Sequence, residues 1–312
     1  MDEVVPCFVA IAKEIVKKER LLIVTPDAKK VKEQLGDDVD YSRITFREME
    51  TNDTWARDHG GISVFDDGVP TVYDFVFNAW GMKFAANYDN LITRNLSHTK
   101  TFAKDIEVVN MQPFVLEGGS LETDGKGTLL TTVECLSSVN RNEYLSKEQL
   151  EYHLKDIFGL HRILWIENGY LEGDDTDSHI DTLVRFCSED TIAYVQCTDT
   201  TDEHFDELAG MEKELHAFTR EDGTPYRLIP LPMADPVTWE SKRLPATYAN
   251  FLIINDAVLL PFYLSPKDEV AKVALTKAFP DREIIGINCL PLIKQHGSLH
   301  CITMQYPEGF IK

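Results

Sequence analysis

Three separate segments carry residue types that could act together on a flat cationic group. The first contains Cys301, which lies in the small polar stretch 297–303. A thiol in such a stretch can be a nucleophile when a positive partner lowers its pKa, because the thiolate is the reactive form. Cys301 is therefore a candidate nucleophile. The opposite interpretation, burial as a small apolar side chain, is favoured for Cys7, Cys135, Cys187 and Cys197.

The second segment is the pair His179 and Asp181. We expect this pair on a strand, where side chains two positions apart point to the same face, so imidazole and carboxylate would share one cavity while Ile180 faces the core. Such a histidine can give and take protons near neutral pH, and the carboxylate can hold a cationic substrate. No further ligand follows at the spacing of a metal site, so the sequence predicts no bound metal.

The third segment contains Trp55, Arg57 and Asp58 and continues into two glycines. A carboxylate can hold a guanidinium through two parallel hydrogen bonds, and a tryptophan face can cover the cation or its alkyl chain. This combination favours a guanidinium ligand. Arg57 could equally pair with an internal acid, which is the ordinary fate of a charged dipeptide.

The elements that must position these residues alternate between helices and strand pairs. Apolar residues recur at helical spacing in residues 5–18, 147–158, 205–218 and 266–278. Two apolar strands joined by a tight acidic or glycine turn recur within residues 55–77, 114–134, 179–197, 248–263 and, near the end, 297–304. The proline- and glycine-containing segment 223–236 is expected to be a long surface connection inside one module, which could also serve as a lid.

A polar residue stands near the start of each strand pair: Asp58, Glu117, His179, Asn250 and Cys301. These positions are roughly 60 residues apart and account for nearly the whole chain. The repeat predicts a closed ring of five ββαβ-like modules, with residues 1–312 as a single catalytic domain. The strand starts would then converge on the axis and bring the five side chains into one site. The alternative is coincidence, since short strand pairs with acidic turns are common in α/β proteins.

Taken together, the motifs resemble the agmatine deiminase family, which also includes the bacterial peptidylarginine deiminases of the Porphyromonas type. The matching segments follow in order between residues 54 and 307, and as a set they are highly specific. They are Trp55-Ala56-Arg57-Asp58, Phe77-Asn78-Ala79-Trp80-Gly81, Glu117-Gly118-Gly119-Ser120, residues 128–136 with Asn140-Arg141-Asn142, Ser178-His179-Ile180-Asp181 and His300-Cys301-Ile302-Thr303.

The resemblance implies a fold and a reaction. The fold is a pseudosymmetric five-bladed α/β propeller, and the reaction is cofactor-free hydrolysis of a guanidinium to a urea with release of ammonia. By this resemblance Cys301 would attack the guanidinium carbon, and Asp58 and Asp181 would bind its nitrogens. His179 would protonate the departing ammonia and then activate the water that hydrolyses a covalent thiouronium intermediate.

The same resemblance assigns three residues to substrate binding. Trp55 would line the substrate slot, and Asn250 matches an active-site asparagine of the family. Glu117 would be an additional acid near the guanidinium or the amine end. Several negative groups near Cys301 would raise the pKa of its thiol, so we expect the thiol to be activated by the protonated histidine or by the cationic substrate.

Composition limits the partners. The 312 residues are 43% hydrophobic, which is typical of a globular protein, and 52 acidic against 31 basic side chains give a formal charge of −21. Such a surface repels phosphate backbones and anionic lipid, so neither nucleic acid nor membrane is expected as a partner. The longest apolar stretch, residues 257–264, is too short to span a bilayer, and Asp2, Glu3 and Pro6 are atypical of an export signal. A cytoplasmic protein is expected, and homo-oligomerisation is left open.

Four functions are compatible with these residues. The leading hypothesis is an agmatine iminohydrolase that makes N-carbamoylputrescine, a step in polyamine synthesis. A peptidyl- or free-arginine deiminase is its rival, and the two differ at the far end of the substrate, where arginine carries a carboxylate. No basic cluster that could receive a carboxylate is evident, which favours agmatine. A non-catalytic guanidinium-binding protein and an amidinotransferase are the other two.

Overall fold

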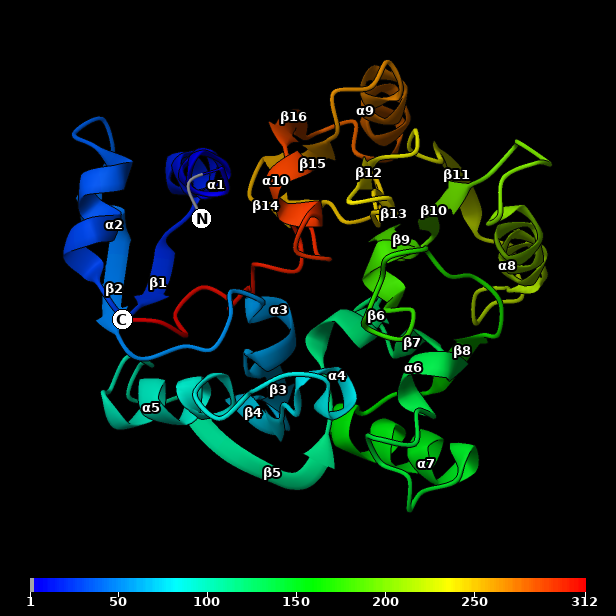
Figure 1. Ribbon diagram of the computed structural model, residues 1–312. Helices are drawn as coiled ribbons and strands as arrows, with labels where there is room; N and C mark the ends of the chain where they lie inside the picture. The colour runs from blue at the N-terminus through cyan, green and yellow to red at the C-terminus, as the bar shows by residue number, and fades with distance from the viewer. Residues whose placement is uncertain (1–2) are drawn as a thin grey trace.

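The computed structural model describes residues 3–312, so Asp2, cited above against an export signal, lies outside the described residues. The chain has a mixed α/β fold with several small separate sheets. Figure 1 shows five of these sheets following one another in chain order around the middle of the molecule. None of the helices described in residues 3–312 is both long and apolar enough to cross a membrane.

Four of the sheets share one construction, in which an antiparallel hairpin is extended by a third strand parallel to the second. The strands, in sheet order, are β3 (Ile62–Asp66), β4 (Val69–Val76) and β5 (Glu107–Val115); β6 (Glu122–Thr123), β7 (Thr128–Thr132) and β8 (Arg162–Ile166); β9 (Val184–Ser188), β10 (Thr191–Gln196) and β11 (Arg227–Pro232); and β14 (Leu252–Ile254), β15 (Ala257–Phe262) and β16 (Glu283–Asn288).

The parallel third strand requires a crossover, and in each of these sheets a helix supplies it. The crossover helices are α5 (Ile92–His98), α7 (Lys147–Phe158), α8 (Phe205–Ala217) and α9 (Lys267–Ala278). The hairpins turn tightly. In the β3–β4 loop, for example, Asp67 and Gly68 have φ of 46° and 84°, the left-handed pair that suits the twist of a two-residue hairpin turn. The first four predicted strand pairs are therefore confirmed, each within a ββαβ unit.

The fifth predicted strand pair, within residues 297–304, is wrong. After α10 (Leu290–Ile293) the chain forms turns there, and no strand is assigned among the described residues beyond β16. Their backbone is engaged elsewhere: His300 N–H donates to Asn250 Oδ1 at 2.9 Å, and the carbonyl of Cys301 accepts from Arg57 N–H at 3.0 Å. A segment pinned in this way cannot form the ladder of a hairpin.

The N-terminal segment supplies the fifth sheet instead. It contains α1 (Val5–Lys18), β1 (Leu21–Thr25), α2 (Ala28–Leu35), η1 (Tyr41–Arg43) and β2 (Ile44–Glu48), and β1 pairs with β2 in parallel. The C-terminus lies next to this sheet (Figure 1), where Arg20 donates to the carbonyl of Lys312 at 3.0 Å. The C-terminus therefore lies beside the N-terminal segment (Figure 1). A small hairpin, β12 (Thr238–Trp239) and β13 (Lys242–Arg243), stands apart from the five sheets.

The helix predictions are confirmed with shifts of at most one residue at an end. The prediction for residues 223–236 is partly wrong, because β11 takes Arg227–Pro232 out of the expected connection. Pro230 and Pro232 are tolerated there because β11 is the edge strand of its sheet and pairs only with β10.

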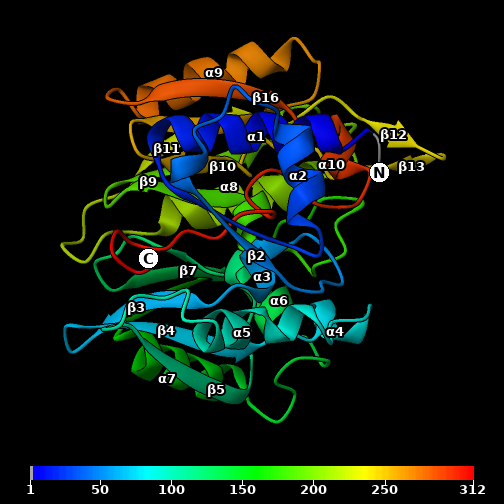
Figure 2. The ribbon, with the colours of Figure 1, turned by 90° about the vertical axis from the view of Figure 1, so that its left-hand side faces the viewer.

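Two large apolar clusters anchor the scaffold. One is built mainly from the β9–β11 and β14–β16 sheets with α1, α8 and α9, and the other from β4, β5, β7, β8 and α7. Figure 2 shows the first group of elements in the upper part of the molecule and the second group in the lower part. Ile180, Ala249 and Phe251, the chain neighbours of His179 and Asn250, belong to the first cluster, so its packing fixes the backbone next to these two polar residues.

Helix α7 offers a test of how local sequence stabilises one crossover. Ser146 accepts from Gln149 N–H, and the Gln149 side chain accepts from Ser146 N–H, which forms a capping box. Ser146→Ala should lower the free energy of unfolding by about 1 kcal/mol in reversible urea denaturation. Ser146→Asp keeps an acceptor and should stay within a few tenths of a kcal/mol of the native value. Equal losses in both variants would contradict the capping role.

Candidate active site

Four of the five predicted residues stand just before the first strand of a three-stranded sheet. Asp58 is in α3 (Ala56–His59), Glu117 precedes η3 (Gly118–Ser120), His179 precedes η4 (Ile180–Thr182) and Asn250 precedes β14. These side chains and Cys301 are all buried and lie in one interconnected cluster. The predicted convergence of strand starts therefore holds for all five residues, although Cys301 reaches the site on a turn.

Cys301 is held from two sides. Its Sγ lies 3.4 Å from Asn250 Oδ1 and 4.0 Å from Asp181 Oδ2. The Asn250 oxygen also accepts from the backbone N–H of Cys301, at 3.4 Å. Burial, together with the charges of Asp181 and Asp58, raises the pKa of the thiol well above its ordinary value. Unless a cation lies next to it, the sulfur is therefore a protonated thiol at neutral pH.

Asp181 is fully buried and only half satisfied. Its Oδ2 accepts from His300 Nδ1 at 2.7 Å, whereas Oδ1 has no hydrogen-bond partner among the described residues. Burial raises the pKa of this carboxyl to about 7. An unsatisfied buried carboxylate oxygen is costly unless a ligand supplies the missing donor.

The expected strand at His179 and Asp181 is wrong in its geometry. The residues between them form η4, a single 3-10 turn, and β9 begins only at Val184. Ile180 does point into the core, as predicted. The two polar side chains converge because the turn carries both toward Asp58, and alternation along a strand plays no part.

The hydrogen bonds that Asp58 accepts within residues 3–312 come from neutral donors. Trp80 Nε1 donates to Oδ2 at 2.9 Å, and Gly119 N–H donates to Oδ1 at 3.0 Å. Burial raises the pKa of this carboxyl above its ordinary value. Gly119 cannot be enlarged here, because a Cβ would lie 2.5 Å from His179 Nδ1 and 2.6 Å from Asp58 Oδ1.

His179 stands between two acids. Its Nε2 is 3.0 Å from Glu117 Oε2, and its Nδ1 is 3.6 Å from Asp58 Oδ1. Burial by itself lowers the pKa of His179, but the charges of Asp58 and of other neighbours, Glu117 among them, outweigh it and raise that pKa well above its ordinary value. The imidazole is therefore protonated at neutral pH and can give a proton.

Behind His179, Glu117 is neutralised by Arg141. The guanidinium donates through Nε to Glu117 at 3.0 Å, and through Nη1 to Asp177 at 2.6 Å. Glu117, Cys135 and His179 bring one side-chain atom each within 4.8 Å of one another. A positive guanidinium already bonded to Glu117 opposes a second cation there, so this cluster suits a hydrogen-bonded network better than a metal.

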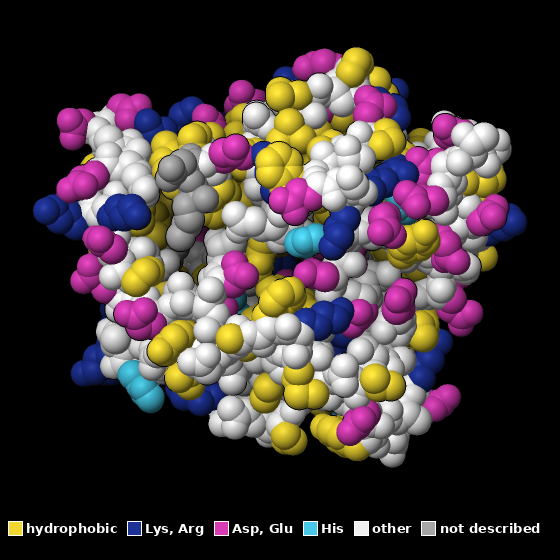
Figure 3. Space-filling view, in the orientation of Figure 1, with side chains coloured by type: hydrophobic (Ala, Val, Ile, Leu, Met, Phe, Trp, Pro, Cys, Tyr) yellow, Lys and Arg dark blue, Asp and Glu magenta, His cyan; other side chains and the backbone are white. Residues whose placement is uncertain are grey.

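A cavity of about 120 Å³ leads from solvent to the sulfur. Cys301, Asp58, Trp55 and Trp80 line its buried end, and a Cβ on Gly297 would collide with the Trp55 ring. Figure 3 shows acidic side chains and a histidine around a hollow in the middle of this face. The more exposed wall consists of Asp53, Phe84, Asp175, Gln295 and His296, and the buried Thr176 also lines the cavity. Of the three residues predicted to bind substrate, Trp55 lines the cavity, whereas Glu117 and Asn250 lie behind it.

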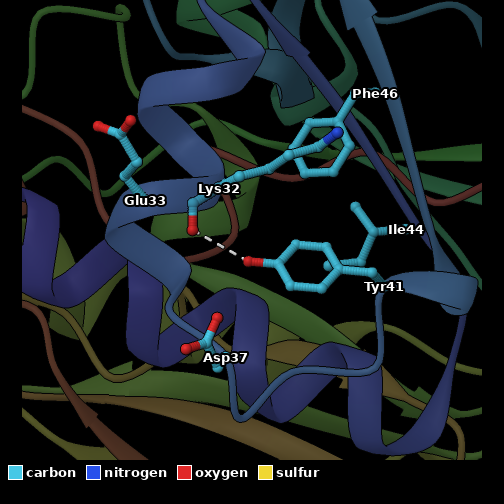
Figure 4. A pocket seen from close by; sticks show the side chains of 6 residues that line it. All are labelled: Lys32, Glu33, Asp37, Tyr41, Ile44 and Phe46. Atoms are coloured by element: carbon cyan, nitrogen blue, oxygen red, sulfur yellow. Dashed lines mark hydrogen bonds between the residues drawn. The ribbon is translucent and has the colours of Figure 1, made fainter.

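A larger cavity of about 400 Å³ lies elsewhere, between α2 and β2. Figure 4 shows the Tyr41 hydroxyl donating to the carbonyl of Lys32, at 3.0 Å, and the Lys32 side chain crossing the Phe46 ring. This cavity shares no lining residue with the one above Cys301. It holds neither a nucleophile nor a buried charge, so it is a surface hollow of the N-terminal sheet.

Four residues that shape the site could not be assigned from the sequence. Trp80 and Arg141 lie inside motifs already quoted, but a role for each emerges only from its contacts with Asp58 and Glu117. His300 is, in the sequence, only a neighbour of the nucleophile. Arg57 is buried, and no ion pair with an acid is found for it in residues 3–312; it donates to Gln305 instead. In the sequence, the position of Arg57 beside an acid suggests only an ion pair. The residue to which Arg57 donates, Gln305, lies about 250 residues away in the chain.

Comparison with known proteins assigns the class. Residues 1–307 match the family described as Porphyromonas-type peptidyl-arginine deiminase. A crystal structure from Porphyromonas gingivalis, described as "Putative Arginine Deiminase", is similar over 100% of this chain and 92% of its own, with 55% identity and a TM-score of 0.98. The chain belongs to the Porphyromonas-type peptidyl-arginine deiminase family.

Within this family the chain is also similar to proteins named for agmatine. The structure of C. jejuni agmatine deiminase with substrate bound has 39% identity and a TM-score of 0.88, over 96% of this chain and 86% of that one. A Marinomonas protein named "Putative agmatine deiminase" is 33% identical over 96% of this chain and 85% of its own length.

The state of the Cys301 thiol can be tested without any substrate. Because its pKa is raised, the thiolate fraction and the rate of alkylation by iodoacetamide should rise about tenfold per pH unit between pH 6 and 9, with no plateau. Peptide mass spectrometry follows the modified residue, and Cys301→Ala identifies its signal. A rate that levels off below pH 8 would mean that the free enzyme already holds a thiolate.

Proposed function

We propose that this protein is an agmatine deiminase, which hydrolyses agmatine to N-carbamoylputrescine and ammonia. The observation that carries the proposal is the cavity above Cys301. A buried thiol and Asp58 stand at its inner end, and Asp53 and Asp175 stand nearer solvent. Among the described residues that line it there is no lysine or arginine. Agmatine is positive at both ends, which suits acids at both ends of the cavity.

We also propose the finer architecture that the repeat predicts. Four ββαβ units and the N-terminal β1–β2 sheet would be the blades of a five-bladed α/β propeller, and residues 1–312 would be one catalytic domain. The order of the sheets around the centre (Figure 1) and the contact of Arg20, just before β1, with the C-terminal Lys312 support this interpretation.

Binding would place the guanidinium between carboxylates. Asp58 and Asp181 would accept its N–H groups, and the free Oδ1 of Asp181 offers an acceptor that nothing else in the described chain uses. The Trp55 ring would cover the cation. A positive group next to the sulfur also lowers the pKa of the Cys301 thiol, so arrival of the substrate would release the thiol proton and create the nucleophile.

The chemical steps would then proceed through a covalent intermediate. The Cys301 thiolate forms a C–S bond to the guanidinium carbon, and the protonated His179 gives its proton to the departing nitrogen, so that a C–N bond breaks and ammonia leaves. The neutral imidazole next takes a proton from water, whose oxygen adds to the thiouronium carbon. Collapse of that adduct breaks the C–S bond, passes the hydroxyl proton to the departing sulfur, and so releases the ureido product and restores the Cys301 thiol. Glu117 would hold His179 in place and favour its protonated form.

Deimination of arginine is the second candidate, because the 55%-identical relative is described as an arginine deiminase. Lys83 is a basic group close to Asp175, and its ammonium is bonded to Asp177 at 2.6 Å and to the carbonyl of Asp175. This pairing leaves the cavity mouth acidic and favours agmatine over free arginine.

The first test supplies purified protein with agmatine, free arginine and an arginine peptide in parallel, and measures ureido product and ammonia. Agmatine should turn over fastest. Cys301→Ala should abolish turnover of all three while its circular dichroism and thermal midpoint match the native protein. Substantial turnover by Cys301→Ala would contradict the covalent mechanism. Faster turnover of arginine or of the peptide would mean that this compound, and not agmatine, is the substrate.

A second prediction concerns the distal amine. Burial, with a contribution from Asp174, raises the pKa of Asp175, as expected for a carboxyl that a cationic ligand would relieve. Asp175→Asn should raise KM for agmatine roughly tenfold and leave kcat within a few-fold, because the amine does not take part in the reaction. The exposed Asp222→Asn is the matched control and should change neither constant. An unchanged KM in Asp175→Asn would remove this residue from the binding site.

A further inference from the structure

Arg185, in β9, is a buried arginine that takes no part in the proposed reaction. Its Nε donates to Glu122 Oε2 at 2.8 Å, and its Nη1 donates to the carbonyls of Ala249 and Phe251. The guanidinium also stacks on the Phe251 ring, with its carbon 4.7 Å from the ring centre. These contacts fix the plane of the guanidinium and leave Nη2 directed at His300 Nε2, 3.2 Å away.

The chemistry of this contact decides where His300 carries its proton. A guanidinium only donates hydrogen bonds, so His300 Nε2 must accept and cannot hold a proton. The proton of the neutral ring is then on Nδ1, which lies 2.7 Å from Asp181 Oδ2 and donates to it. Burial, with Arg185 and Arg57 nearby, lowers the pKa of His300 well below its ordinary value, which agrees with a neutral ring.

We infer that His300 is a positioning residue: fixed by Arg185 as the neutral Nδ1–H tautomer, it orients Asp181 and favours the ionised form of that carboxyl, with Oδ1 free for a cation. A neutral donor stabilises the carboxylate without cancelling its charge, whereas a protonated histidine there would compete with the guanidinium. The backbone N–H of His300 is held by Asn250, so one residue aligns both Asp181 and the neighbouring Cys301. The catalytic consequence rests on the proposed deimination, but the tautomer does not.

Other charged groups face Asp181 as well. His179 and the basic Arg57 and Arg185 favour its ionised form, whereas Asp58 and a Cys301 thiolate oppose that form. Glu122 faces Arg185 from the other side and partly offsets its charge. In the described chain the Asp181 carboxylate has two hydrogen-bond donors: His300, at 2.7 Å, and the Cys301 thiol, whose sulfur is 4.0 Å from the same oxygen and which no longer donates once it ionises. Removing the His300 donor should therefore raise the pKa of Asp181.

The chain contains a matched control for His300. His204 is also buried, its Nδ1 lies 2.7 Å from Asp202 Oδ1, and its Nε2 accepts from the backbone N–H of Glu172 at 2.7 Å. Arg243 pairs with the same aspartate. None of these residues lines the cavity above Cys301. By the same hydrogen-bond reasoning His204 carries its proton on Nδ1, between an N–H donor and an aspartate, but it lies away from the cavity above Cys301.

The kinetic test measures kcat/KM for agmatine from pH 5 to 9. Asp181 must be ionised to hold a cation, so activity falls as this group takes up a proton, and a higher pKa moves the acidic limb to higher pH. His300→Phe should shift the limb upward by about one pH unit. His300→Asn, whose amide can donate from nearly the position of Nδ1, should restore most of the shift. His204→Phe should lower the thermal midpoint and leave the limb in place.

The results that would overturn the inference differ from those that would contradict the proposed function. Loss of activity in His300→Phe with an unmoved limb, or an equal shift in His300→Asn and His300→Phe, would overturn the inference. A native protein that turns over no guanidinium would instead contradict the proposed function, and a second measurement then decides the inference.

That measurement is NMR of the native protein labelled with ¹⁵N-histidine, in which His300→Asn identifies the His300 signals. The expected result is a protonated Nδ1 and an unprotonated Nε2 from pH 6 to 8. A proton on Nε2 in that range would overturn the inference, whether or not the protein is active.

Discussion

The structure depends on burying three carboxylates at one place without leaving any of them unsupported. Asp58, Glu117 and Asp181 are all almost inaccessible to solvent, and an isolated buried charge would cost far more than a small domain's stability can supply. The acids receive different partners. Glu117 is bonded to the permanent cation Arg141, whereas the hydrogen bonds to Asp58 and Asp181 come from the neutral donors Trp80, Gly119 and His300, and the protonated His179 lies 3.6 Å from Asp58.

Because their partners differ, the three acids have different roles in the site. The pKa of Glu117 is lowered by the hydrogen bond from His179 and the charge of Arg141, despite its burial, so it serves as a fixed negative group behind His179. The pKa values of Asp58 and Asp181 are raised by burial, so each gains from an added cation. A guanidinium would supply that charge to both acids and, at the same time, ease ionisation of the Cys301 thiol. The protein's own charges therefore favour a cation between these acids and next to the thiol.

The partners come from segments whose backbone would not adopt its conformation alone. Ala79, Trp80 and Met82 all have φ between 54° and 65°, and Asp177 and Ser178 have φ of 64° and 61°. Such angles are unfavourable for residues other than glycine, and the surrounding contacts must compensate. Arg141 bonds Asp177 as well as Glu117, and Lys83 bonds Asp177 from the other segment. The ion pairs that satisfy the acids thus also hold the two strained segments against the site.

The amino-acid sequence by itself determined the repeating ββαβ units, the positions of the four main helices and the five polar residues that meet at the centre. These features follow from local periodicity and from turn residues such as Asp67 and Gly68, which act over a few positions. Tertiary structure alone decided that residues 297–304 form turns, that the chain's N-terminal segment forms the fifth sheet, and that a 3-10 turn presents His179 and Asp181. It also decided the partners of each buried charge, such as Arg141 for Glu117 and His300 for Asp181. Those choices depend on contacts between residues far apart in the chain, where the cost of burying a charge outweighs local preference.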